Sequence, residues 1–135
     1  PTVIDMVGDV EGRPAVIYDD MIQSGGTLLQ VVQRLLKRGA SEVHAAAVHA
    51  DFTPGALDQI KASPLKILVL SDTTTTALEV VGKNVEIVTT ARILAQAIWR
   101  IHTQQSVGWI FRTLRRKGEL PPVDLELAPG IRDRA

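Results

Sequence analysis

The chain has 135 residues, 45% of them hydrophobic, which is enough for one compact domain with an ordinary core. Fifteen basic and fifteen acidic side chains cancel, which argues against a general binder of nucleic acid or of a membrane surface. With no cysteine, these residues hold no disulfide, thiolate metal site or cysteine nucleophile, and a cytoplasmic location is expected.

Charge is unevenly distributed along the chain. Residues 1–90 hold seven Lys or Arg and eleven Asp or Glu, a net charge of −4. Residues 91–135 hold eight and four, a net charge of +4. A mixed solvated surface is the plain interpretation, and the alternative is a basic stretch that faces a partner subunit or an anion. No apolar run approaches the roughly 18 residues of a membrane span.

Short apolar runs rich in Val, Ile and Leu alternate with longer segments of helical period. This pattern is typical of βα units around a parallel sheet, so we predict an α/β fold whose mainly parallel sheet is flanked by helices. Near-continuous apolar runs also indicate strands that are covered on both faces. A turn at 8–12 would make the first two strands an antiparallel hairpin. The predicted strands are Val3–Val7, Ala15–Tyr18, Val43–Val48, Ile67–Leu70 and Val85–Val88.

Three segments have the apolar spacing of a helix. The first includes Leu28 to Leu35 and stops at Gly39. The second is expected to open at Thr53-Pro54, with Thr53 as N-cap and Pro54 as the first helical residue. The third covers 91–102. After residue 117, glycines and prolines interrupt any regular pattern, which predicts a poorly ordered tail or an arm on another subunit.

The segment most informative about chemistry is Val16–Leu28, with the sequence VIYDDMIQSGGTL. An apolar strand ends in two carboxylates, and a short loop leads to Gly-Gly-Thr at the start of a helix. The free N–H groups of a first helical turn, with the helix dipole, favour an anion. Gly25 and Gly26 let the backbone approach a phosphate closely, and the hydroxyls of Ser24 and Thr27 can donate to it.

The adjacent carboxylates of Asp19 and Asp20 need a different ligand group, because they repel phosphate. An ionised carboxylate only accepts hydrogen bonds, and a sugar diol donates them. The segment therefore favours a sugar phosphate over the structural alternative, an exposed strand end with acidic residues. It is neither a Walker P-loop nor a G-x-G-x-x-G dinucleotide motif.

These residues resemble the phosphoribosyl-diphosphate motif of type I phosphoribosyltransferases, and more closely the C-terminal part of ribose-phosphate pyrophosphokinases. The resemblance covers about residues 3–111, so we predict a partial phosphoribosyltransferase-like domain over 1–111 and an extension or tail over 112–135. Further resembling stretches are Val7–Arg13, Leu35–Ala40, Val48–Phe52, Ile93–Ile98, and Ile101-His102 with Ser106-Val107.

The resemblance implies that the two aspartates hold the ribose hydroxyls of ribose 5-phosphate. It implies that the 5-phosphate is held by the loop residues Gln23, Ser24, Gly25, Gly26 and Thr27. The family transfers diphosphate from Mg-ATP to ribose 5-phosphate, which gives phosphoribosyl diphosphate and AMP. The family's catalytic Lys/Arg loop, ATP-binding segment and magnesium ligands are not found here. The expected partners are therefore Mg²⁺ with ATP, the missing N-terminal part of the enzyme, and further copies in a hexamer.

Two positions depart from the family's pattern. Gln23-Ser24 stands where the family commonly has Asp-Thr, which removes a carboxylate. Ser106 matches a serine of a regulatory phosphate or ADP site, but Gly108 replaces the second serine there. A regulatory role of Ser106 is therefore the weaker of these expectations.

Two other functions stay open at this point. One is a phosphoribosyltransferase that acts on a nucleobase, which would need a base-binding hood. The other is a non-catalytic regulatory subunit, which the change at Gln23 would suit. Because the catalytic-loop and ATP-binding parts are missing, we expect these 135 residues to be a fragment without synthetase activity of its own.

Overall fold

The computed structural model describes residues 8–78 and 82–123. The chain forms two compact units, Pro1–Val88 and Thr89–Ala135, which are described separately. The boundary expected at 111/112 falls within a helix of the second unit, and the division into these two ranges stays a prediction.

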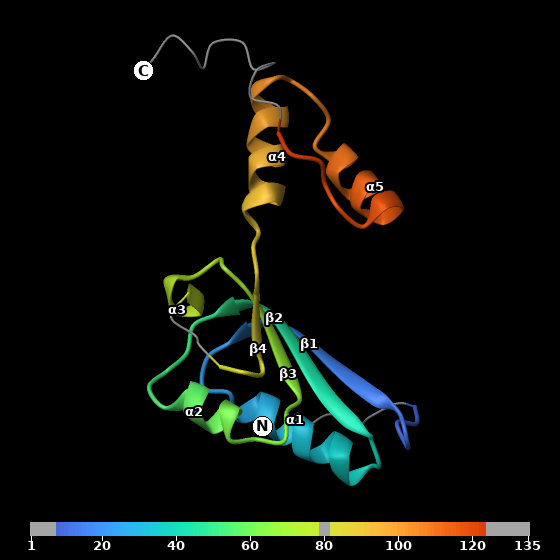
Figure 1. Cartoon of the computed structure of the whole chain (residues 1–135), viewed down its shortest axis with the longest axis vertical. Helices are drawn as coiled ribbons and strands as arrows, with labels where there is room; N and C mark the ends of the chain where they lie inside the picture. Colours follow the sequence, from blue (N-terminus) through green and yellow to red (C-terminus); the bar gives the residue numbers. More distant parts are fainter. Residues whose placement is uncertain (1–7, 79–81, 124–135) are drawn as a thin grey trace. The chain divides into compact units, whose positions relative to one another are not determined.

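The first unit is built on a four-stranded sheet in the order β1-β2-β3-β4 (Figure 1). Each neighbouring pair of strands is parallel, so the predicted α/β fold with a parallel sheet is confirmed. The strands are β1 (Pro14–Ile22), β2 (Glu42–Ala50), β3 (Ile67–Ser71) and β4 (Val85–Val88). Each of them contains one of the predicted strands. The other predicted strand, 3–7, lies outside the described residues, and so does the hairpin built on it.

The core of this unit lies between one face of the sheet and two helices, α1 (Gly26–Lys37) and α2 (Ala56–Lys61). The short helix α3 (Thr75–Leu78) follows β3. Apolar side chains spaced three or four apart on α1 are buried against the strands, as the helical period predicted. The most buried core residues include Val32, Val43, Ile60 and Leu68.

The opposite face of the sheet is open along β1. Val16 is 65% exposed and Tyr18 is 81% exposed, although both belong to an apolar run. Parallel strands of this kind are normally covered on both faces. Among the described residues, the expected second cover is therefore missing from β1.

The predicted start of the second helix is wrong. Helix α2 begins at Ala56, and its N-cap is Gly55 with φ of 81°. The N–H of Thr53 instead donates a hydrogen bond to the Gln23 carbonyl at 3.2 Å. The Thr53 carbonyl accepts from the N–H of Ala56 at 3.0 Å, so a turn precedes the helix.

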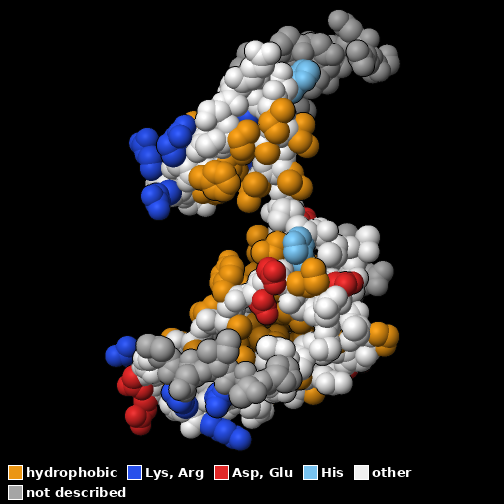
Figure 2. Space-filling view, turned by 180° about the vertical axis from the view of Figure 1, so that it is seen from behind, with side chains coloured by type: hydrophobic (Ala, Val, Ile, Leu, Met, Phe, Trp, Pro, Cys, Tyr) orange, Lys and Arg blue, Asp and Glu red, His pale blue; other side chains and the backbone are white. Residues whose placement is uncertain are grey.

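The second unit contains α4 (Ala91–His102) and α5 (Gly108–Lys117). Helix α4 has the predicted bounds, but its buried residues are Gln96 and Arg100. Its apolar stripe is exposed: Leu94 is 56% exposed, and Ile98 and Ile101 are each 68% exposed. Figure 2 shows hydrophobic side chains gathered on the surface of this unit, beside the Lys and Arg side chains of α5.

Residues 118–123 pack on their own unit, so for this stretch the expectation of a poorly ordered tail is wrong, and the arm on another subunit stays a prediction. Leu120 is only 3% exposed, and its carbonyl accepts from Arg92 Nη1 at 3.2 Å. Gln96 Nε2 donates to the carbonyl of Pro121 at 2.8 Å. Residues 124–135 lie outside the described part of the chain. Within 8–78 and 82–123, no helix is long and apolar enough to cross a membrane.

Candidate functional site

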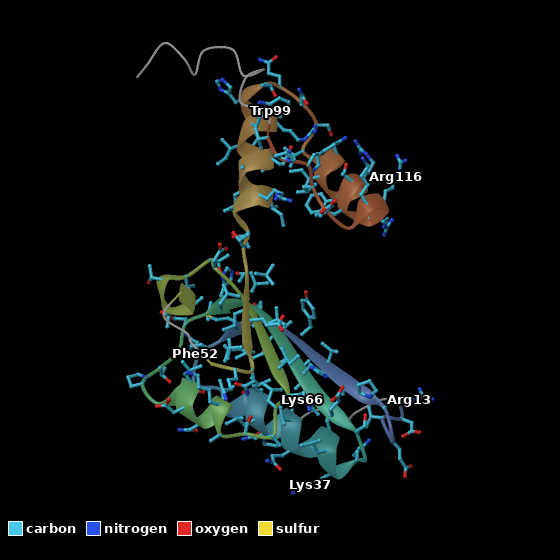
Figure 3. All side chains as sticks on the ribbon, in the orientation of Figure 1. Arg13, Lys37, Phe52, Lys66, Trp99 and Arg116 are labelled. Atoms are coloured by element: carbon cyan, nitrogen blue, oxygen red, sulfur yellow. The ribbon has the colours of Figure 1, made fainter. Side chains whose placement is uncertain are left out.

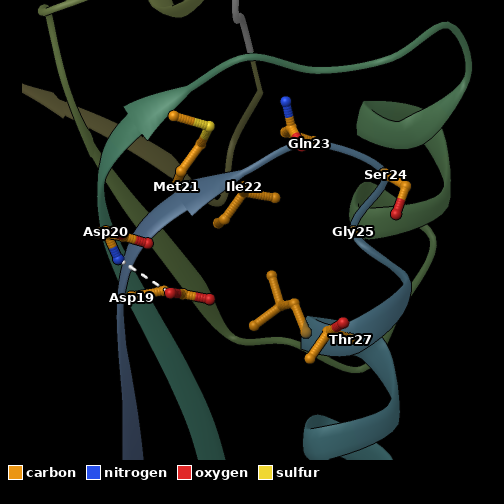
Figure 4. Close-up of a pocket in the computed structure, with 9 residues that line it drawn as sticks. Asp19, Asp20, Met21, Ile22, Gln23, Ser24, Gly25 and Thr27 are labelled. Carbon is orange, nitrogen blue, oxygen red and sulfur yellow. Dashed lines mark hydrogen bonds between the residues drawn. The ribbon is translucent and has the colours of Figure 1, made fainter. Parts of the chain in front are cut away.

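A cavity of about 380 Å³ lies where β1 ends and α1 begins (Figure 4). Six of the seven predicted binding residues line it: Asp19, Asp20, Gln23, Ser24, Gly25 and Thr27. The seventh, Gly26, does not line it but begins the helix. Sequence reasoning missed the apolar lining of Met21, Ile22 and Leu28, whose only signal was their place inside the motif.

The turn at Gly25 requires glycine for two reasons. Its φ is 73°, in the left-handed region that side chains disfavour. A Cβ atom added at Gly25 would also lie 2.9 Å from Ile60 Cδ1, which belongs to α2. The loop therefore lies close against Ile60 of α2, and a side chain at position 25 would require Ile60 to move.

The first turn of α1 is electrostatically suited to an anion. Its N-cap residue makes no side-chain hydrogen bond and the turn contains no acidic residue, so the free N–H groups and the helix dipole favour an anion there. Ser24 Oγ accepts weakly from the N–H of Gly26 at 3.4 Å. The hydroxyl-bearing residues Ser24 and Thr27 are both exposed and line the cavity.

The two aspartates lie near the carboxyl end of β1, two and three residues before its last residue, Ile22. Both are exposed, and the N–H of Asp20 donates to Asp19 Oδ1 at 2.9 Å. Figure 4 shows the Asp19 side chain extending from β1 toward the first turn of α1. Neighbouring strand residues point to opposite faces, and both aspartates are among the residues that line this cavity. Together they present hydrogen-bond acceptors with a negative charge.

Gln23 ties the loop to the end of β2. Its Nε2 donates to Asp51 Oδ2 at 3.3 Å, and the N–H of Asp51 donates to the Ile22 carbonyl at 3.0 Å. An aspartate at position 23 could not donate to Asp51 in this way. The departure from the family's pattern therefore has a local structural use.

A second polar group lies at the carboxyl ends of β2 and β3. Thr73 Oγ1 lies 2.8 Å from His49 Nδ1 and donates to the Val48 carbonyl at 2.9 Å. Ser71 Oγ also donates to that carbonyl. These hydroxyls satisfy a strand-end backbone group and do not line the cavity.

The described residues contain no group of three or more His, Cys, Asp or Glu side chains that could hold a metal ion. Ser106 lies in the second unit, in the loop between α4 and α5. It is exposed, and its carbonyl accepts from Arg100 Nη1 at 3.4 Å. Its regulatory role stays a prediction.

Comparison with known proteins gives a consistent result. The ribose-phosphate pyrophosphokinase of Synechococcus elongatus is 39% identical over 111 residues, which cover 82% of this chain and 34% of that protein. The corresponding protein of Vibrio parahaemolyticus is 41% identical over 110 residues, 81% of this chain and 35% of that protein. Ribose-phosphate pyrophosphokinase 2, chloroplastic, of Spinacia oleracea is 34% identical over 82% of this chain and 28% of its own length.

Among solved structures, the phosphoribosylpyrophosphate synthetase of Mycobacterium smegmatis matches with a TM-score of 0.69 and 26% identity. The match covers 73% of this chain and 33% of that one. This likeness agrees with the predicted phosphoribosyltransferase-like fold. The chain thus spans about a third of the length of the curated relatives it matches. Residues 1–112 match the phosphoribosyl synthetase-associated domain, and the chain therefore belongs to that domain family.

Proposed function

We propose that this chain is the ribose 5-phosphate-binding part of a ribose-phosphate pyrophosphokinase. The observation that carries the proposal is the single cavity that unites the two aspartates with the loop at the start of α1. Relatives that bear the name of this enzyme match more than four-fifths of the chain. The cavity volume of about 380 Å³ lies in the range of small-molecule sites.

The phosphate of the sugar binds at the loop in this proposal. The N–H groups of the first turn of α1 donate hydrogen bonds to its oxygens, and so do the hydroxyls of Ser24 and Thr27. Gly25 lets the backbone approach without a Cβ atom, in a conformation held by contact with Ile60. The Gln23–Asp51 hydrogen bond keeps this loop in place.

The ribose diol binds at the aspartates. The carboxylates of Asp19 and Asp20 accept hydrogen bonds from the two hydroxyls, and their charge strengthens those bonds. They also repel phosphate, so the sugar has one favoured direction in the cavity. The role of these residues is to bind and orient the sugar while its 1-hydroxyl is left for the reaction.

The remainder of the reaction is assigned to the rest of the enzyme. Phosphoryl transfer depends mainly on positioning and on neutralisation of charge, and Mg²⁺ that arrives with ATP would supply such neutralisation. Because the described residues hold no cluster of three possible ligands, no metal site is proposed on them. By itself this chain is expected to make no phosphoribosyl diphosphate.

Placement within the whole enzyme is also part of the proposal. The placement rests on the resemblance alone, which implies the C-terminal third, with an N-terminal part that supplies the ATP site and the catalytic loop. A cytoplasmic location and assembly into a hexamer follow from the same resemblance.

Calorimetric titration of the chain with ribose 5-phosphate, and separately with inorganic phosphate, tests the proposal. We expect ribose 5-phosphate to bind more tightly than phosphate. The variant Asp20→Ala should weaken ribose 5-phosphate by roughly 10- to 100-fold, the effect of losing hydrogen bonds to a charged group. Its affinity for inorganic phosphate should change little.

A matched control is Glu86→Ala, which removes an exposed carboxylate of the same unit on β4. It should leave both affinities unchanged. Equal losses for the two ligands in Asp20→Ala would contradict the assignment of the diol to the aspartates. No heat with ribose 5-phosphate would favour a regulatory subunit that has lost the site.

A further inference from the structure

The second unit packs α4 with its polar side inward. The buried residues of this helix are Gln96 and Arg100, which line a cavity of about 200 Å³ between α4, α5 and residues 121–123. The guanidinium of Arg100 lies 3.7 Å from the centre of the Trp109 ring. A surface helix normally buries its apolar stripe and exposes its polar side. The apolar side of α4 is therefore left for a surface outside its own unit.

That apolar side of α4 forms an exposed stripe. Leu94, Ile98 and Ile101 are spaced by four and three residues, so they lie on one side of the helix. Each of them is more than half exposed. Phe111, on α5 of the same unit, is 70% exposed. Large exposed apolar patches mark interaction surfaces, so the stripe is suited to packing against another apolar surface.

The open face of the sheet in the first unit is a surface of the matching kind. Ile17 packs against the core, so its neighbours Val16 and Tyr18 point to the opposite face. The strand register places Ala46 beside Tyr18 and Val69 beside Ala46. The apolar surface of this face therefore extends from β1 over β2 to β3.

The order of the strands explains why this face is open. Strands β1 to β4 follow one another in a single direction across the sheet. Right-handed crossovers then place the connecting helices on one face, and the opposite face is left without a connecting helix. Parallel strands are normally covered by helices on both faces. The open face therefore lacks a helix with an apolar side.

We propose that the stripe of α4 in one copy of this chain packs on the open face of β1 and β2 in a second copy. The exchange is reciprocal, so a dimer contains two identical contacts and closes on itself. The charges of the two surfaces' regions are complementary. Residues 1–90 carry a net charge of −4 and residues 91–135 carry one of +4, which attracts the unlike regions of two copies.

A second copy can supply this helix without a restriction that the same chain has. Two residues, Thr89 and Thr90, join β4 to α4, and the three Cα steps from Val88 to Ala91 span at most about 11 Å. Strand β1 lies three strand spacings, or about 14 Å, from β4. Helix α4 of a second copy is not held by this connection, so its stripe can lie along β1.

Analytical ultracentrifugation of the whole chain tests the dimer. We expect a species of twice 14.7 kDa, with a dissociation constant of about 1–50 µM. Ile98→Asp and Tyr18→Asp each place a charge in the contact, so each should raise that constant at least about tenfold. Gln33→Asp adds the same charge at an exposed position on α1 and should leave the constant within about twofold. A chain that stays monomeric at about 500 µM, or equal losses in all three variants, would overturn the proposal.

Paired cysteines identify the surfaces that meet. The chain has no cysteine of its own, so Tyr18→Cys and Ile98→Cys can be prepared as separate variants and then mixed. A short bismaleimide should join the two different variants to one another far more than it joins either variant to itself. Lys37→Cys, at a residue that Figure 3 labels on α1, is the matched control for Tyr18→Cys. It should not be joined to Ile98→Cys.

The other outcomes of the cross-linking contradict the proposal. Predominant joining of Ile98→Cys to itself would show that two stripes meet each other. A chain that carries both Tyr18→Cys and Ile98→Cys gives a further outcome. If the reagent joins its two cysteines within one chain, at a concentration well below the dissociation constant, the occupant of the face is not a second copy. Equal joining of Lys37→Cys and Tyr18→Cys to Ile98→Cys would show that the contact has no preferred surface.

Discussion

The two cavities of this protein are built in different ways. In the first unit, the residues that line the cavity all come from one short segment, 19–28, in which a strand end, a loop and a helix start follow one another. In the second unit, the cavity is lined by residues from α4, α5 and 121–123. The polar groups of the first cavity are the exposed carboxylates of Asp19 and Asp20, together with the groups of the loop and of the first turn of α1. The polar groups of the second cavity belong to buried side chains.

This difference explains why one cavity could be predicted and the other could not. A phosphate site at a helix start depends on local backbone geometry, which glycines and hydroxyls reveal in order along the chain. The cavity of the second unit depends on which faces of two helices meet. Arg100 and Gln96 are polar residues on an amphipathic helix, and by pattern alone they belong to its solvent face.

The largest expected effect is a loss of stability in the first unit that leaves the second unit unchanged. Leu68 is fully buried in the core of the first unit, so Leu68→Ala should lower the free energy of unfolding of that unit by about 2–5 kcal/mol. Denaturation followed by circular dichroism should show an earlier transition. Tryptophan emission, which arises only in the second unit, should keep its midpoint.

The reverse variant is the control. Ile110 is 1% exposed on α5, and Ile110→Ala should move the tryptophan transition. A shift of the tryptophan midpoint in Leu68→Ala would mean that the two units unfold as one.

The next effect tests the loop of the first cavity. In Gly25→Ala, the new side chain must adopt a left-handed backbone conformation, and its Cβ atom lies too close to Ile60. We therefore expect a loss of about 2–4 kcal/mol in the free energy of unfolding. Gly55→Ala has a similar φ of 81° but nothing within 4 Å of the added Cβ. It should lose only about 1–2 kcal/mol. Equal losses in urea titrations would show that the contact with Ile60 is unimportant.

A smaller effect is expected where the loop meets β2. Gln23→Glu replaces a donor to Asp51 with a like charge, which should weaken binding of inorganic phosphate about two- to fivefold. Adding Asp51→Asn should restore most of the affinity, because the asparagine can donate to the glutamate. Calorimetry on the two single variants and the double variant measures this coupling. Purely additive effects would argue against the pair.

The smallest effect concerns the contact of His44 Nε2 with Glu42 Oε1 at 3.1 Å, which is an ion pair when the imidazole is protonated. The Glu42 side chain is 43% exposed. Glu42→Gln should therefore change the unfolding free energy by about 0.2–0.5 kcal/mol at most. The difference should vanish in about 1 M salt, where charges are screened within about 3 Å. A larger loss, or one insensitive to salt, would show that solvent screens this pair less than its exposure implies.

Much of the first unit could be predicted from sequence. Runs such as Val43–Val48 and Ile67–Leu70 became strands of a parallel sheet, because buried parallel strands demand continuous apolar residues. The start of α2 could not be predicted. Thr53 and Pro54 satisfy the local rules for a helix start, but the hydrogen bond from Thr53 to the distant Gln23 carbonyl holds the backbone in a turn.

By itself, the sequence determined the features that depend on neighbouring residues. These are the strand positions, the span of α4 and the segment 19–28 with its carboxylates and glycines. Only the tertiary structure decided what depends on distant residues: the contact of Gly25 with Ile60, the Gln23–Asp51 bond, and the burial of Arg100 while the apolar stripe of α4 stays exposed. The physical reason is that periodicity and backbone preference act over a few residues, whereas burial is set by the surfaces that pack together.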